Sequence, residues 1–166
     1  MFTIENNEIR YNIIYVYTIN DFAHSNLIKI GKASFCSSQS PTAFPDDCDS
    51  LRKIAIKRIK QQTQTAIVNF DLLFVTLGRR LVVLPDGFSS LENFSDGDIH
   101  SLLKEKGIFP RKINGKESEW FSISLPLVKK IIENYKNYYG EKESNYNNTI
   151  SLVNSPYYVD LENRYV

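Results

Sequence analysis

Cysteine is scarce in this sequence, and its placement excludes a zinc-finger or disulfide-stabilised fold. The two cysteines, Cys36 and Cys48, lie in one stretch rich in Ser, Pro and Asp, and they lack a metal-binding spacing such as C-x-x-C. Both are therefore expected to be free thiols in the reducing environment of the cytoplasm.

Long hydrophobic runs and an excess of charge are also missing. No apolar stretch approaches the roughly 18 residues of a membrane-spanning helix, and the first residues, MFTIENNEIRYN, lack the basic and apolar segments of a secretory signal. We therefore expect a cytoplasmic protein with no membrane partner. Because 20 Lys and Arg face 19 Asp and Glu, only a local patch of charge would indicate a nucleic-acid partner.

The sequence does contain enough apolar residues for one globular domain. Of its 166 residues, 42% are hydrophobic and 23% are charged. The chain divides into an N-terminal extension over residues 1–11, a domain over 12–140, and a linker or tail over 141–166 in which Asn, Ser and Glu dominate.

Apolar periodicity and turn residues predict an α/β (α+β) domain with a small, mainly antiparallel sheet of three strands flanked by helices. A short additional strand is expected over 81–84, and a bend in the third long strand at Asn69 or Asp71. Asp49 or Ser50 is expected to cap the first helix. The predicted strands cover residues 12–20, 27–31, 66–77 and 119–123, the predicted helices cover 51–62, 96–106 and 125–139, and 35–49 is a loop.

Two helices carry polar side chains that suggest a site. Arg58 falls in the middle of the apolar face formed by Leu51 and Ile54, so its charge must be paired or must line a cleft. In the second helix, Asp96 and His100 are four residues apart and lie on the same side.

The ordered set of motifs resembles a known family. "YVYTIND" and "LIKIG" are followed by the helix "KRIKQQT", by "DGDIH", by Arg111 and by "EWF". Together they are similar to the GIY-YIG nuclease superfamily, and more narrowly to its T5orf172/MUG113-like branch, over residues 12–133. The resemblance implies a GIY-YIG-like fold and a metal-dependent endonuclease that hydrolyses DNA, with RNA left open as a substrate.

The same resemblance implies a role for each charged residue. Arg58 would hold the scissile phosphate, and Asp96, with His100 beside it, would bind one divalent cation, Mg²⁺ or Mn²⁺. Tyr17 would be the general base, and Lys29 would lower its pKa from the usual value of about 10. Further residues expected at the site or on its nucleic-acid surface are Tyr15, Gly31, Lys32, Lys57, Arg111 and Glu119.

Departures from the family pattern leave alternatives open. Tyr15 replaces the first glycine, Lys29 replaces the second tyrosine, and Asp96 replaces the usual Glu. One alternative is a catalytically degraded nucleic-acid-binding module of the same fold, and another is a protein-interaction module. The resemblance also implies fusion to a helicase- or restriction-type enzyme in a longer protein.

Overall fold

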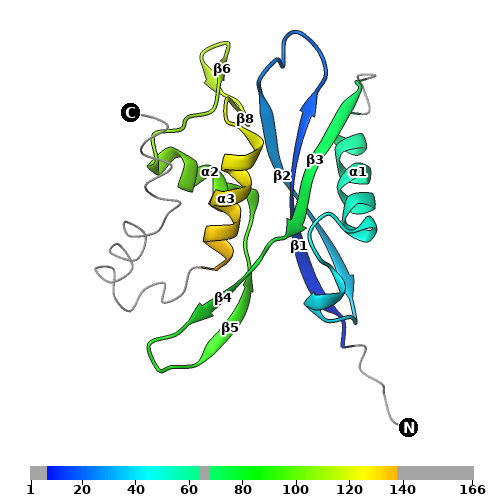
Figure 1. The fold of residues 1–166 in the computed structure, drawn as a ribbon, viewed down its shortest axis with the longest axis vertical. Helices are drawn as coiled ribbons and strands as arrows, with labels where there is room; N and C mark the ends of the chain where they lie inside the picture. The colour runs from blue at the N-terminus through cyan, green and yellow to red at the C-terminus, as the bar shows by residue number, and fades with distance from the viewer. Residues whose placement is uncertain (1–6, 64–67, 138–166) are drawn as a thin grey trace.

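The computed structural model describes residues 7–63 and 68–137, which form an α+β domain around one curled antiparallel sheet (Figure 1). The strands in spatial order are β3 (Phe70–Leu77), β1 (Ile9–Ile19), β2 (Ile28–Ser37) and β8 (Trp120–Phe121). The antiparallel sheet is confirmed, but it has four strands, because the segment predicted over 119–123 adds a short strand to the outer edge of β2. The predicted tail over 141–166 lies outside the described residues.

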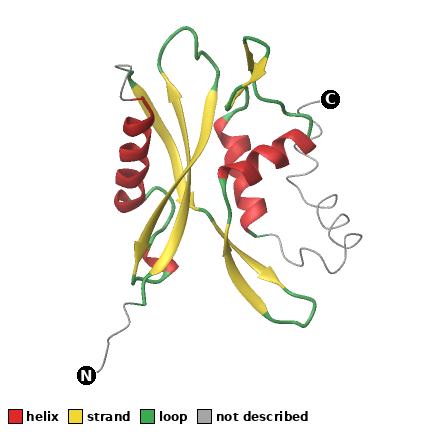
Figure 2. Ribbon diagram, turned by 180° about the vertical axis from the view of Figure 1, so that it is seen from behind, coloured by secondary structure: helices red, strands yellow, loops and turns green. Residues whose placement is uncertain are grey.

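Helices cover both faces of the sheet, as Figure 2 shows from behind. Helix α1 (Asp49–Thr63) packs on one face, and α2 (Asp96–Glu105) and α3 (Leu125–Lys136) pack on the other. Side chains of a strand alternate between faces, so the central strand β1 sends Tyr11, Ile13, Tyr15 and Tyr17 toward α1, and Ile14 and Val16 toward α2 and α3. The centre of β1 is therefore an apolar run with no polar face.

Both long hairpin strands exceed their predicted limits. Strand β1 begins at Ile9, inside the segment expected to be an extension, because Tyr11 is fully buried and pairs with Phe35. Strand β2 continues past Gly31 to Ser37, into the predicted loop. Beyond Lys29, no described strand pairs with its outer edge.

The bend predicted in β3 is a β-bulge at a different residue. The register with β1 shifts so that Val16 faces Phe74 and Tyr17 faces Leu72. Leu73 is therefore the extra residue, and the positions predicted for the bend, Asn69 and Asp71, are wrong.

Residues 79–93 form a hairpin that extends away from the sheet (Figure 1). The short strand expected over 81–84 is confirmed within β4 (Arg79–Val83), whereas its partner β5 (Ser89–Asn93) was not predicted. The turn contains Gly87 in the left-handed region at φ 86°. Two further strands, β6 (Lys112–Ile113) and β7 (Lys116–Glu117), form a small hairpin before β8.

The helices follow the prediction with changes at their ends. Asp49 is the first residue of α1 and not its cap. Ser124 does precede α3, whose last residue is Lys136, and Gly107 follows α2 with φ 80°. A 3₁₀ turn, η1 (Pro41–Ala43), lies in the predicted loop.

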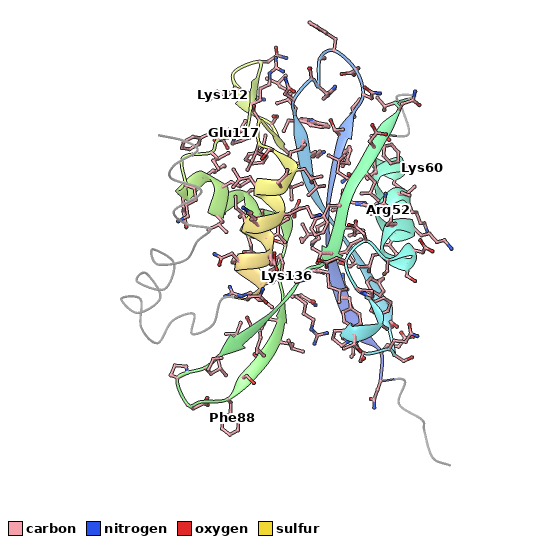
Figure 3. All side chains as sticks on the ribbon, in the orientation of Figure 1. Arg52, Lys60, Phe88, Lys112, Glu117 and Lys136 are labelled. Atoms are coloured by element: carbon pink, nitrogen blue, oxygen red, sulfur yellow. The ribbon has the colours of Figure 1, made fainter. Side chains whose placement is uncertain are left out.

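A polar network ties α3 to the sheet. The hydroxyl of the fully buried Thr76 donates to Asp46 Oδ1 at 2.6 Å and accepts from Lys136 Nζ at 2.7 Å. Burial lowers the pKa of Lys136, and Figure 3 labels this residue where α3 meets the sheet. The hydroxyl thus joins groups from three segments of the chain.

Candidate functional site

The β1–β2 pairing places the motifs YVYTIND and LIKIG side by side. Tyr15 lies opposite Gly31, and Tyr17 lies opposite Lys29. A Cβ atom at Gly31 would lie 2.6 Å from Cε2, Cζ and Oη of Tyr15. The predicted end of this strand at Gly31 is therefore wrong, since β2 continues to Ser37, and the glycine instead makes room for the Tyr15 ring.

The two phenols occupy the α1 face of the sheet. Their ring centroids are 6.0 Å apart, and both residues are buried. Tyr15 Oη donates to Gln62 Oε1 at 3.1 Å, which links the phenol to the last turn of α1. Tyr15, expected only at the margin of the site, is therefore close to its centre.

Burial raises the pKa of both phenols. Lys29 lowers the pKa of Tyr17 through its charge and a hydrogen bond, but desolvation has the larger effect and the net direction is upward. Lys29 thus acts in the expected direction without producing the lowered pKa that a general base needs. In the described protein Tyr17 therefore keeps its proton at neutral pH, and its oxygen accepts the hydrogen bond from Lys29.

Strand β8 brings two further residues beside the phenols. Lys29 pairs with Trp120 in the sheet, and Lys29 Nζ lies 3.0 Å from Glu119 Oε2. The Trp120 ring packs edge-on against Tyr17 with 5.6 Å between centroids. The charge of Lys29 is therefore shared between the Tyr17 phenol and the Glu119 carboxylate.

Arg58 lies at a cleft and not within the apolar face of α1. The residues of α1 buried against the sheet are Leu51, Ala55 and Ile59, and Arg58 is exposed. It opens onto a cavity of about 340 Å³ between α1 and the free edge of β2. The lining residues are Lys32, Ala33, Ser34, Ile54, Lys57, Arg58 and Gln61, so the cavity holds three cations and no carboxylate.

Helix α2 begins at the same edge of β2. His100 Nε2 donates to the Ile30 carbonyl at 3.0 Å, just past the residues that β8 pairs with. The first turn is closed by Asp98 Oδ2, which accepts from the Ser95 backbone N–H at 2.8 Å. Asp96 is therefore not needed as a cap, and its half-buried carboxylate has no hydrogen bond or ion pair within residues 7–63 and 68–137. His100 positions the helix that carries it.

Three charged residues from separate segments act on the Tyr15 phenol. The positive charge of Arg58 lowers its pKa, whereas the negative charges of Asp96 and Glu119 raise it, in addition to the larger effect of burial. Arg58, Asp96 and Glu119 therefore all lie within electrostatic range of the Tyr15 phenol, beside which Tyr17 packs.

The remaining predicted residues divide into two groups. Lys32 and Lys57 line the cavity beside Arg58. Arg111 lies elsewhere, where its Nη1 donates to the Ala23 carbonyl at 3.2 Å in the β1–β2 loop. Sequence reasoning missed Gln62 as a partner of Tyr15, although it stands one helical turn after Arg58.

The possible metal ligands of the site suit only a divalent cation that keeps much of its water. Across the described parts of the chain, no three His, Cys, Asp or Glu side chains come together as a metal-binding group. Mg²⁺, however, retains several waters and is often held by one or two carboxylates together with substrate phosphates. The Asp96 carboxylate, which has no partner among the described residues, fits that requirement.

Comparison of the chain with protein-family models, with curated proteins and with solved structures finds no significant match. The family resemblance therefore rests on the sequence motifs alone. Among the described residues, no helix is long and apolar enough to cross a membrane.

Proposed function

We propose that this chain is a metal-dependent endonuclease domain of the GIY-YIG type that hydrolyses phosphodiester bonds of DNA. The observation that supports it most strongly is that the charges of Arg58, Asp96 and Glu119 all act on the buried Tyr15 phenol, while Arg58 also lines a basic cavity.

The cavity supplies the phosphate-binding part of the proposed reaction. Arg58 presents a planar guanidinium that can donate two parallel hydrogen bonds to phosphate oxygens. Lys32 and Lys57 add positive charge on either side of the same opening. These three residues would orient the scissile phosphate and stabilise the charge that develops on it.

Asp96 would hold the divalent cation that the proposed reaction requires. A Mg²⁺ ion bound there supplies a Lewis acid and lowers the pKa of a bound water. Because the pKa of Tyr17 is raised, its phenol would donate a hydrogen bond to the water or to the phosphate. The proton acceptor would be the Glu119 carboxylate, which lies beside Lys29.

Plasmid cleavage tests the assignment. With Mg²⁺ or Mn²⁺, the wild-type protein is expected to nick or linearise supercoiled DNA, and Arg58→Ala or Asp96→Asn to lower the rate by at least about 100-fold. Lys60→Ala is the matched control, because Lys60 is an exposed cation of α1 outside the cavity (Figure 3). Unchanged cleavage by both site variants would contradict the assignment.

A nucleic-acid-binding module without catalysis is the second candidate. The raised pKa of Tyr17 favours it, because the phenolate expected of a general base is not available at neutral pH. Such a module would bind DNA in a salt-sensitive manner. Binding that depends on Arg58, without cleavage in any divalent cation, would select this candidate.

A further inference from the structure

The loop between β1 and β2 presents an aromatic ring to solvent. Phe22 is 97% exposed, compared with 71% for Phe88 and 64% for Phe109. A phenylalanine side chain stabilises a folded domain when it is buried, and none of that stabilisation is realised here. Phe22 therefore contributes little to the folded domain itself.

The loop is held in place by contacts on both sides of Phe22. Asp21 Oδ1 accepts from the His24 backbone N–H at 2.8 Å and lies 2.7 Å from His24 Nδ1. The His24 ring packs against Trp120 with 4.6 Å between centroids, and Arg111 donates to the Ala23 carbonyl. Phe22 thus projects from an anchored turn.

Exposed cations lie on the hairpin next to this loop. The β6–β7 hairpin stands next to the β1–β2 loop in both Figure 1 and Figure 2, and the Arg111 hydrogen bond joins them. Arg111, Lys112 and Lys116 are all exposed. Glu117 is already paired with Lys104 at 2.7 Å, so the charge that this hairpin offers a ligand is mainly positive.

An aromatic ring next to exposed cations fits a nucleic acid better than a protein surface. Bases stack on aromatic side chains while Lys and Arg neutralise the phosphates. The loop also continues the strand that carries Tyr17. At about 3.3 Å per residue, Phe22 lies at most roughly 16 Å along the chain from Tyr17, which is about five base steps of DNA.

We propose that Phe22 stacks on a nucleobase of the bound nucleic acid, within about five nucleotides of the part of the strand that lies at Tyr17. Arg111, Lys112 and Lys116 hold the adjoining backbone. This proposal rests on the proposed function for the nature of the ligand, but it requires binding and not cleavage.

Metal-free binding of single-stranded and nicked duplex oligonucleotides tests the proposal. Phe22→Ala is expected to weaken binding by about 5- to 150-fold, the effect of losing one base–aromatic stack. A 2-aminopurine base placed at successive positions is expected to be quenched at one position by wild-type protein, and at none by Phe22→Ala.

Phe88→Ala is the control, since it removes an equally bulky exposed ring from the β4–β5 hairpin, at the opposite end of the molecule (Figure 3). It is expected to bind like wild type. The ring of Trp120, the single tryptophan, packs against that of His24, so its fluorescence also reports ligand binding at the loop.

The outcomes separate this proposal from the proposed function. Binding weakened by Arg58→Ala but unaffected by Phe22→Ala overturns the stacking proposal alone. Binding that depends on Phe22 without metal-dependent cleavage supports the stacking proposal and refutes the nuclease. No binding of any oligonucleotide at low salt overturns both.

Discussion

For the Gly31→Ala substitution, the local backbone and the tertiary contact predict changes in folding stability of opposite sign. Gly31 lies within β2 and has no left-handed φ. A glycine inside a strand is less stable than alanine by about 0.5–1 kcal/mol, so the backbone alone predicts that the variant is more stable. The Tyr15 ring predicts the reverse, because the new methyl carbon would lie 2.6 Å from three of its atoms.

The magnitude depends on how far the Tyr15 ring can move. The ring is fully buried, is packed against Tyr17, and is bonded through its hydroxyl to Gln62. Overpacking a tight site of this kind costs about 1–3 kcal/mol. After subtracting the backbone gain, we expect a net loss of about 1–2 kcal/mol, or roughly 3–8 °C in melting temperature.

Urea unfolding of four proteins measures this effect: wild type, Gly31→Ala, Tyr15→Leu and the double variant. With the ring removed, Gly31→Ala is expected to be neutral or stabilising, which gives a coupling energy of about 1–3 kcal/mol. Gly97→Ala is the control, since its Cβ would meet only Ser95 Oγ at 3.4 Å in α2, and we expect it to stabilise. A stabilising Gly31→Ala in the wild-type background would refute the close approach of the Tyr15 ring.

Three further predictions concern stability. Because burial raises the pKa of Tyr15 and Tyr17, the native state holds these protons more tightly than the unfolded state. The free energy of unfolding should therefore decrease as pH rises above about 10. The Tyr17→Phe substitution should make the urea midpoint of unfolding less dependent on pH in that range. Thr76→Val should cost about 1–3 kcal/mol in urea unfolding, because both polar partners of the buried hydroxyl lose it. Asp98→Ala should lower the melting temperature more than Asp96→Ala, since only Asp98 closes the first turn of α2; equal losses would indicate that Asp96 also caps the helix.

Local patterns predicted most of the secondary structure. The strand–loop–strand order of residues 12–31 predicts an antiparallel hairpin with Tyr17 and Lys29 on neighbouring strands, and the structure pairs these two residues. The β5 strand was missed, since Ser89–Asn93 has little β-branched or aromatic character and forms only by pairing with β4.

The site was predicted less completely, for physical reasons. Helical periodicity places Arg58 between Leu51 and Ile54 and leaves open whether its charge is paired or lines a cleft; only the structure shows the exposed side chain at the cavity. The close contact between Tyr15 and Gly31 depends on the exact strand register. The direction of the Tyr17 pKa depends on whether burial or Lys29 has the larger effect, and a sequence gives no measure of burial at that resolution.

Strand β8 has a consequence for the order in which the domain folds. It contributes only Trp120 and Phe121 to the sheet, yet the position of Glu119 and the partner of Lys29 depend on it. The contact between β2 and β8 closes a loop of more than half the chain, whereas β1 and β2 are neighbours in sequence and pair with a far smaller loss of loop entropy. During synthesis the β1–β2 hairpin can therefore form early, whereas Lys29 gains its acidic partner only after Glu119, more than two thirds of the way along the sequence, has emerged.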